Sequence, residues 1–399
     1  MAAKRVAVLV GCNYEGSMAE LEGCVNDVWA MKDILRERFH FEERDIHVLV
    51  DNDPKFHMPT GANIRQALRS AIASTSSPND AVFFHFSGHG TRLPPANARP
   101  NAQLSPLDYD ECIVPCDMNL ITDEDIFEIV ESLAEGVRFT IVADCCHSGG
   151  LIRYEKEQIG DSFTSQMSWL QRVSCNNSTD KTYEKEESIT DRGKKRKETH
   201  VGFGRSLPLP ALLHIIREKT KAKHTQLSNI RDVLVMNFKD ESSAKFRRSM
   251  DLFAGICFKK PKQCQDQEIC SSTREPSHYL KECDAKTSHV RNHQNLPSKG
   301  VLHNNAAILL SACQAYEVAK DITPVSPHKD MKSRSTRCKF GAMSYAIIAV
   351  LSQLDPSMKL TNRQLVMQTK SVLLEEGLSQ QHPGLYCCDE YVDVPFICN

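Results

Sequence analysis

The sequence reads Ala81-Val82-Phe83-Phe84-His85-Phe86-Ser87-Gly88-His89-Gly90, an apolar run that leads into a histidine between two glycines. A second apolar run, residues 139–143, leads into Asp144-Cys145-Cys146-His147-Ser148-Gly149. Continuous apolar runs bounded by turn residues predict strands that are buried on both faces of a sheet. Because the carboxyl ends of parallel strands lie at one edge, where such folds bind ligands, we expect the histidine and a cysteine to meet there.

The surrounding sequence predicts an α/β fold with a mostly parallel central sheet. Strand-like apolar runs alternate with amphipathic segments of helical period, which is typical of a sheet that carries helices on both faces. Capping boxes at Thr122/Asp125 and Thr361/Gln364 mark two helix starts. Strands are predicted at residues 6–10, 46–50, 81–86, 139–143 and 307–310, and helices at 25–39, 62–73, 124–133, 342–351 and 362–374.

The chain divides into three regions by the texture of its sequence. Residues 1–152 form a first ordered region, and residues 305–399 form a second that we expect to complete the same sheet. Between them, residues 153–304 are polar and charged, with helical period only near 207–216. We expect this insertion to be partly disordered.

Composition excludes several classes of protein. A net charge of −2 over 399 residues argues against nucleic-acid binding, which needs a basic surface. No apolar stretch is long enough to cross a membrane, and residues 1–5 lead directly into a strand, so we expect a cytosolic or nuclear protein. The 16 cysteines are then expected to be reduced. The basic run at 193–197 is either a nuclear signal or a solvated, cleavable segment, and we favour the second.

Other interpretations of the same residues remain. His89 and Cys146 could be a loop histidine and a small buried core residue, although the glycines around both favour catalysis. The fold could also serve as an interaction module without activity. A nucleotide-binding enzyme is disfavoured because no glycine-rich phosphate loop follows the first strand. Zinc is disfavoured because the cysteines of the insertion lack close paired spacing: Cys257, Cys264, Cys270 and Cys283.

These motifs resemble the signature of the metacaspases, in particular the plant type II members. The resemblance is carried by the segments 23–27, 87–90, 144–149, 312–315, 340–342 and 382–387. It implies a caspase-like three-layer sandwich and a cysteine endopeptidase that acts on protein and peptide substrates with Arg or Lys before the cut. It also implies a role in stress responses, wounding or programmed cell death.

The resemblance assigns the catalytic roles. Cys146 is the expected nucleophile, since the family pattern places the reactive thiol directly before His-Ser-Gly, and Cys145 is expected to pack in the core. A protonated His89 is expected to lower the pKa of the thiol and then to protonate the leaving amine. The backbone N–H groups of Gly90 and Cys146 are the implied oxyanion donors.

The same resemblance implies a pocket for a basic side chain. Asp27 and Asp144 are its expected base, with Cys24 and Ser87 beside them. Two carboxylates attract a guanidinium or an ammonium group. Asp27 could instead be a helix N-terminal cap.

An enzyme that prefers arginine has candidate cleavage sites in its own insertion. We expect a precursor that cuts itself between Arg205 and Ser206, in a polar segment that resembles the processing site of type II metacaspases. The basic residues 194–197 are competing sites. We expect the two fragments to remain associated as a monomer, because they share one sheet.

Calcium is the one metal that the resemblance brings into question. Asp110, Asp123 and Glu124 fall at positions that look like part of the family's calcium site. Arg153 stands where the family pattern has an aspartate, so we expect no cofactor to be required. The plain alternative is that Asp123 and Asp125 only favour the N-terminus of their helix.

Overall fold

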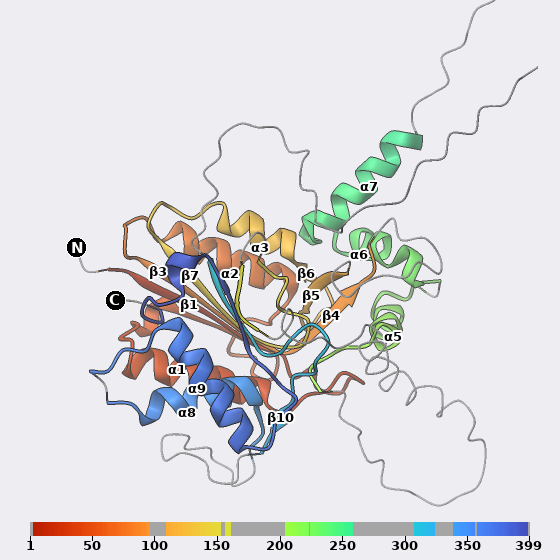
Figure 1. Ribbon diagram of the computed structural model, residues 1–399. Coiled ribbons are helices and arrows are strands. Elements are labelled where there is room, and N and C mark those ends of the chain that lie inside the picture. Colours follow the sequence, from red (N-terminus) through yellow and green to blue (C-terminus); the bar gives the residue numbers. More distant parts are fainter. Residues whose placement is uncertain are drawn as a thin grey trace, which may run out of the picture.

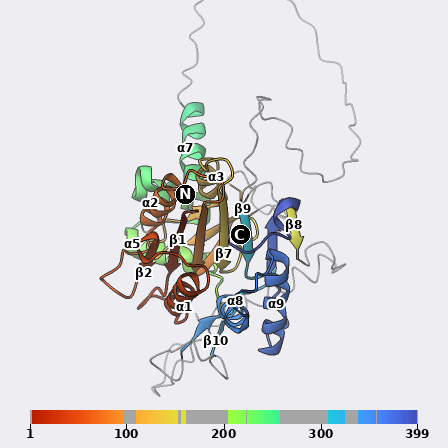
Figure 2. The ribbon, with the colours of Figure 1, turned by 90° about the vertical axis from the view of Figure 1, so that its left-hand side faces the viewer.

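A seven-stranded sheet forms the centre of the computed structural model, which describes residues 3–95, 109–152, 156–160, 204–222, 224–257, 307–323, 338–355 and 357–397 (Figure 1). Its strands are, in spatial order, β2 (Ile46–Val50), β1 (Arg5–Gly11), β3 (Ala81–Ser87), β7 (Arg138–Asp144), β9 (Ala307–Ser311), β12 (Gly384–Cys387) and β8 (Lys156–Ile159). The first five are parallel, and β12 runs antiparallel to both β9 and β8. Figure 2 shows β2 and β8 at opposite edges.

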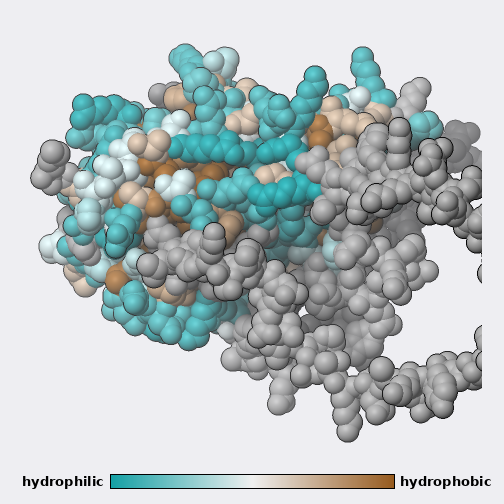
Figure 3. Space-filling view, turned by 90° about the horizontal axis from the view of Figure 1, so that it is seen from above, coloured by the Kyte–Doolittle hydropathy of each residue, from teal (hydrophilic) through white to brown (hydrophobic). Residues whose placement is uncertain are grey.

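Helices cover both faces of this sheet. One face carries α2 (Gly61–Ala73) and α3 (Asp123–Val130), and the other carries α1 (Cys24–Glu37), α8 (Ala342–Gln353) and α9 (Asn362–Glu375) (Figure 1). The predicted three-layer α/β sandwich is therefore confirmed, as are the capping boxes at Thr122 and Thr361. Seen from above, the described surface is mainly hydrophilic with a small apolar area near its middle (Figure 3).

Side chains of each central strand alternate between two hydrophobic clusters. In β1, Val8 lies in the cluster under α2 and α3, whereas Leu9 lies in the cluster under α1 and α8. The same alternation in β3 sends Phe84 to the first cluster and Phe83 to the second. Both faces of the sheet are thus buried, which explains why these strands read as continuous apolar runs.

Two small sheets lie beside the central one and were missed in the sequence. β4 (His89–Leu93), β5 (Asp110–Val114) and β6 (Ile121–Thr122) form an antiparallel sheet, and β10 (Asp321–Ile322) pairs with β11 (Phe340–Gly341). These strands are short or polar, so apolar periodicity does not reveal them.

The insertion contains more structure than its sequence predicts. β8 joins the central sheet, and three helices follow at α5 (Leu209–Thr220), α6 (Ile230–Phe238) and α7 (Ala244–Cys257). Ile215, Leu234 and Phe246 from these helices join the cluster under α2 and α3. Helical period near 207–216 predicted α5, whereas β8, α6 and α7 were missed, because tertiary packing stabilises short elements that have little local signal. None of the described helices is long and apolar enough to span a bilayer.

Candidate active site

His89 lies directly after β3, at the start of β4, with its side chain buried. Its backbone N–H donates to the Tyr14 hydroxyl over 2.8 Å, and that hydroxyl donates to the Val114 carbonyl over 2.5 Å. The imidazole Nε2 is 2.8 Å from the Ala19 carbonyl oxygen. Nδ1 is buried without a hydrogen-bond partner among the described residues. This arrangement leaves one ring nitrogen free to exchange a proton.

Burial also sets the protonation state of this ring. Loss of solvent lowers the pKa of His89 to about 4, and the hydrogen bond to Ala19 opposes the shift only in part. The imidazole is therefore neutral at physiological pH in this state of the protein. The role of a protonated His89 stays a prediction, since burial favours the neutral imidazole, which can act first as a base.

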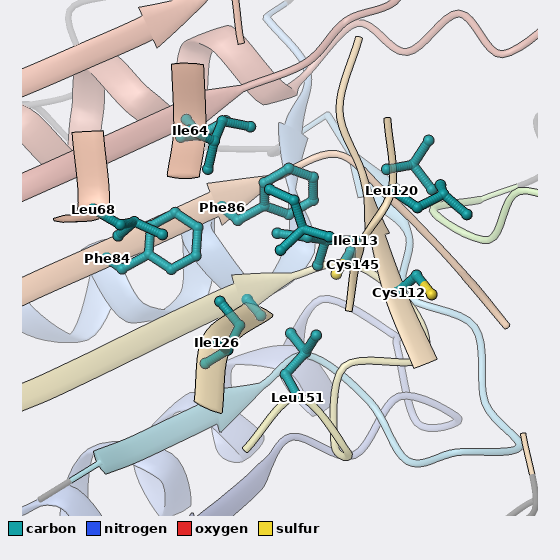
Figure 4. Packing of buried hydrophobic residues seen from close by; sticks show 14 of the residues in the cluster. Ile64, Leu68, Phe84, Phe86, Cys112, Ile113, Leu120, Ile126, Cys145 and Leu151 are labelled. Atoms are coloured by element: carbon teal, nitrogen blue, oxygen red, sulfur yellow. The ribbon is translucent and has the colours of Figure 1, made fainter. Parts of the chain in front are cut away.

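Cys146 and Cys145 follow β7 and face opposite sides of the sheet. Cys145 packs in the cluster under α2 and α3, close to Phe86 and Ile113 (Figure 4), whereas Cys146 belongs to the cluster on the other face. The alternation of β7 thus continues past its last paired residue. Burial raises the pKa of the Cys145 thiol well above its usual value, which disfavours a reactive thiolate there.

The loops that carry His89 and Cys146 are in direct contact. A Cβ atom at Gly90 would lie 1.7 Å from the Cys146 carbonyl oxygen, so only glycine allows this approach. The Gly90 and Cys146 backbone N–H groups both donate to one acceptor, the carbonyl oxygen of Arg205, at 3.0 and 3.2 Å. Two converging N–H groups of this kind are the donors that an oxyanion needs.

The Arg205 backbone is held on both sides of that carbonyl. Its own N–H donates to the Ala319 carbonyl over 2.9 Å, and the Ala319 N–H lies 3.1 Å from the Cys146 sulfur. After Arg205, the Leu207 N–H donates to the Gly90 carbonyl over 2.9 Å, and Ser206 forms a parallel bridge with Gly90. The Arg205–Ser206 peptide bond therefore lies beside Cys146 and between these backbone contacts.

The Arg205 side chain is fully buried in a pocket of acidic and hydroxyl groups. Nη2 is 2.9 Å from Asp27 Oδ2, and Nη1 donates to the Ser87 hydroxyl over 2.7 Å. Nη1 also donates to the Asp144 carbonyl over 2.7 Å and lies 3.3 Å from the Asp144 carboxylate. The predicted residues Asp27, Asp144 and Ser87 are thus brought together around one guanidinium.

The two pocket carboxylates are fixed by backbone donors near the start of α8. The Gly341 N–H donates to Asp27 over 2.9 Å, and the Ser344 N–H donates to Asp144 Oδ2 over 2.7 Å. Burial raises the pKa of both carboxyl groups, and the Arg205 charge opposes this. Asp27 lies in the first turn of α1, but it makes no capping hydrogen bond to the helix. Cys24 is close enough for the Arg205 charge to lower its pKa, against a larger effect of burial.

Comparison with known proteins agrees with this geometry. Residues 4–154 match the family model described as metacaspase, peptidase C14 domain. Metacaspase-7 of Arabidopsis thaliana is 37% identical over 99% of this chain and 100% of its own length, and Metacaspase-9 of the same plant is 37% identical over 100% and 98%. The chain belongs to the metacaspase family. It is a type II member and hence a cysteine-type peptidase that acts on proteins.

Structural comparison supports the fold of this metacaspase. A crystal structure of a Geobacter sulfurreducens protein superposes with a TM-score of 0.50, covering 99% of this chain and 98% of the other at 15% identity. At that identity the likeness concerns the arrangement of the strands and helices only.

The acids of this metacaspase that resemble a calcium site form ion pairs with basic side chains of the insertion. Asp110 is 2.7 Å from both Arg231 and Lys245, and Lys245 also lies 2.8 Å from Asp123. Glu124 pairs with Arg248. No group of three His, Cys, Asp or Glu side chains among the described residues is arranged to hold a metal ion. The acids as they stand do not fit calcium, and Arg153 lies outside the described residues.

Several residues of the site were not identified from the sequence. Asp321 lies 2.8 Å from Arg205 Nε, Tyr14 positions His89, and Ala319 binds the Arg205 backbone. Asp321 and Ala319 come from a segment with no periodic pattern. The sequence therefore gave no indication that this segment lies beside Arg205. One sequence signal was the glycine at 204, directly before Arg205, where the structure has a φ of +60° and a tight contact with Val318.

Proposed function

We propose that this metacaspase cleaves peptide bonds after arginine or lysine, and that its first substrate is its own Arg205–Ser206 bond. The observation that carries the proposal is the position of Arg205. Its guanidinium is buried against Asp27 and Asp144, and its carbonyl oxygen accepts from the two N–H groups that would stabilise an oxyanion. A buried cation needs such partners, since an unpaired one costs several kcal/mol, of the order of 3–5.

The chemistry follows from the same contacts. His89 accepts the proton of the Cys146 thiol as the sulfur attacks the Arg205 carbonyl carbon. The oxyanion forms between the Gly90 and Cys146 N–H groups, where a carbonyl oxygen is already held. His89 then gives its proton to the Ser206 nitrogen as the C–N bond breaks and a thioester remains. Water hydrolyses the thioester, with His89 again acting as the base.

The contacts on the leaving side support a substrate bound as an extended strand. Besides the Leu207 backbone bonds, the Thr91 hydroxyl donates to the Leu207 carbonyl over 2.9 Å. His147 Nε2 lies 3.1 Å from the Ser206 hydroxyl. On the side of the bound segment, most of the contacting atoms belong to the Leu207 backbone, which any substrate sequence can supply. We therefore propose that selectivity resides in the pocket for the basic side chain.

We propose that the two fragments remain associated as a monomer after the cut. The N-terminal fragment would contain β7 and β8, and the C-terminal fragment would contain β9 and β12. β9 pairs with β7, and β12 pairs with both β9 and β8, so the central sheet alternates between the fragments at this edge. Strands in a buried sheet have the highest local stability of a fold, which supports continued association after a loop is cut.

We propose that activity requires no calcium. Lys245 and Arg231 together already balance the charges of Asp110 and Asp123, and a divalent ion would have to displace them. A chelator should leave the rate of peptide cleavage unchanged. Loss of activity in chelator, with recovery on adding calcium, would overturn this part of the proposal.

We also propose a cytosolic or nuclear protein with a role in stress responses or programmed cell death. The resemblance to plant type II metacaspases supports the role, and the free state of the described cysteines is compatible with a reducing compartment. Imaging of the tagged full-length chain in unstressed and stressed plant cells tests the location.

Two assays test the central proposal. Purified protein incubated with fluorogenic peptides that end in Arg, Lys or Asp should cleave the first two only. N-terminal sequencing of the small fragment should begin at Ser206, and an Arg205→Ala precursor should stay uncut there. A start within residues 195–198, or cleavage that persists in purified Cys146→Ala protein, would overturn the assignment.

A further inference from the structure

Asp321 belongs to the pocket but differs in position from the other two carboxylates. It lies on β10, whose backbone pairs Asp321 with Gly341 of β11, the residue whose N–H binds Asp27. The backbone before Asp321 is fixed by the Lys320 carbonyl, which accepts from the Ala342 N–H over 2.9 Å, and by the Ala319 carbonyl, which accepts from Arg205, and after it Ile322 pairs with Phe340. Asp321 is therefore held rigidly against the arginine.

Each nitrogen of the guanidinium has its own acidic partner. Asp27 contacts Nη2 and Asp144 contacts Nη1, which are the two terminal nitrogens. Asp321 Oδ1 accepts instead from Nε over 2.8 Å, the nitrogen inside the side chain. Its side chain is 19% exposed, whereas those of Asp27 and Asp144 are fully buried, so Asp321 forms the outer wall of the pocket.

We propose that Asp321 determines the preference of this pocket for arginine over lysine, an inference that rests on the proposed function. The argument is chemical. Counting from Cα, the atom of lysine that corresponds to arginine Nε is the Cε methylene, which donates no hydrogen bond. The lysine ammonium reaches the region of Asp27, Asp144 and Ser87 with its three donors, and Asp321 then faces a methylene group. Arginine satisfies all three carboxylates with one planar fork, and lysine does not.

The decisive experiment measures the ratio of kcat/KM for two substrates within each variant. The processed enzyme is assayed with a matched pair of peptides that differ only in Arg or Lys before the cut. We expect Asp321→Ala to lower kcat/KM for the Arg peptide about tenfold, the effect of losing one hydrogen bond to a charged group, and to leave the Lys peptide nearly unchanged. Asp321→Asn keeps an acceptor without its charge and should give an intermediate ratio.

Asp27→Asn is the matched comparison, because Asp27 contacts a terminal nitrogen. It should lower kcat/KM for both peptides and leave their ratio as in the wild type. The ratio does not depend on how much of the protein is active, so partial misfolding of a variant cannot imitate the expected result.

Self-cleavage provides a second measurement on the intact precursor. Arg205→Lys should slow self-cleavage in the wild type about tenfold, and should have little further effect in an Asp321→Ala background. If the effects of Arg205→Lys and Asp321→Ala were additive, Asp321 would not act through its hydrogen bond to Nε.

The outcomes separate this inference from the proposed function. Wild-type protein that cleaves neither Arg nor Lys peptides would overturn the proposed function. Wild-type protein that cleaves both, with Asp321→Ala lowering the two equally or abolishing the cleavage of Lys peptides, would overturn the role of Asp321 alone.

Discussion

Two groups of carboxylates in this metacaspase bind basic side chains from the same insertion, yet they differ in burial. Arg205, Asp27 and Asp144 are fully buried. In the second group the side chains of Lys245 and Asp110 are 26% and 16% exposed, and that of Arg248 is 58% exposed. Removing the partner of a buried charge is strongly destabilising, whereas exposed ion pairs contribute only about 0–1 kcal/mol each to stability.

The backbone makes the larger difference between the two groups. Arg205 is extended, and its carbonyl oxygen is bound by the Gly90 and Cys146 N–H groups. Lys245 lies in α7, where its peptide groups belong to a helix and cannot adopt the extended form that a protease binds. The same pairing of charges therefore accompanies an extended segment bound across the candidate active site in one place and a helix contact in the other. Substitutions at the candidate active site, in the core and in both groups test this difference.

The largest effect is expected from the two neighbouring cysteines. Cys146→Ala should abolish cleavage at Arg205 and of added peptides, because the remaining Cys145 thiol faces the opposite side of the sheet. Cys145→Ala should keep most of the activity and lose about 1 kcal/mol of stability from its buried position. Fluorogenic assays and urea unfolding measure the two quantities. Comparable loss of activity in both variants would contradict the assignment.

Removal of a pocket charge should have the next largest effect. Asp27→Asn should raise the barrier for cleavage after Arg by about 2–5 kcal/mol, because a buried guanidinium loses its ionic partner. The readout is kcat/KM for an Arg peptide. Asp123→Asn is the equivalent change in the second, partly exposed group and should leave kcat/KM unchanged. An unaffected Asp27→Asn enzyme would show that the pocket does not bind substrate.

A buried histidine outside the catalytic pair should make stability depend on pH. His85 is buried with Nε2 2.9 Å from the Ser344 hydroxyl, and burial lowers its pKa from 6.5 to about 3. Below pH 6.5 the folded chain therefore holds fewer protons than the unfolded chain, so this contribution to stability is lost as the pH falls.

At pH 5 the loss amounts to about 2 kcal/mol relative to pH 8. His85→Gln should lack it, as measured by urea unfolding of Cys146→Ala protein at both pH values. The control is His214→Gln, at an exposed residue paired with Glu218, which should unfold with the same pH dependence as its parent. Equal pH dependence with and without His85 would refute this prediction.

The smallest effect is expected in the exposed group. Lys245→Met should lower stability by about 1 kcal/mol or less, since its ion pairs with Asp110 and Asp123 are only partly buried. Peptide cleavage should not change. Urea unfolding and kcat/KM check the two parts, and a large fall in kcat/KM would mean that this group supports the active site after all.

The sequence signal that marks His89 and Cys146 as candidate catalytic residues is local. His89 and Cys146 each follow a strand that is buried on both faces, and such strands read as apolar runs at any position in the chain. Asp27 and Asp144 were found through the family pattern, and the structure places both at the Arg205 guanidinium. Capping boxes at Thr122 and Thr361 were equally local and are present.

The partners of the acids that resemble a calcium site could not be predicted from local sequence. Their type and spacing are visible in the sequence, but the identity of their partner is not. Lys245 follows Asp110 and Asp123 by more than a hundred residues and reaches them only because α7 packs against α3. A basic residue in a polar insertion gives no indication of which carboxylate it will meet.

The sequence alone determined the α/β class, the alternation that separates Cys145 from Cys146, and the residue types that the chemistry needs. These properties depend on near neighbours in the chain, since burial and strand geometry repeat every two residues. The tertiary structure was needed to bring Asp321 to Nε of Arg205, to bury the His89 imidazole, and to place Lys245 beside Asp110 and Asp123. Each of these properties depends on which distant segments of the chain come into contact and on how far they exclude solvent. A local sequence pattern encodes neither.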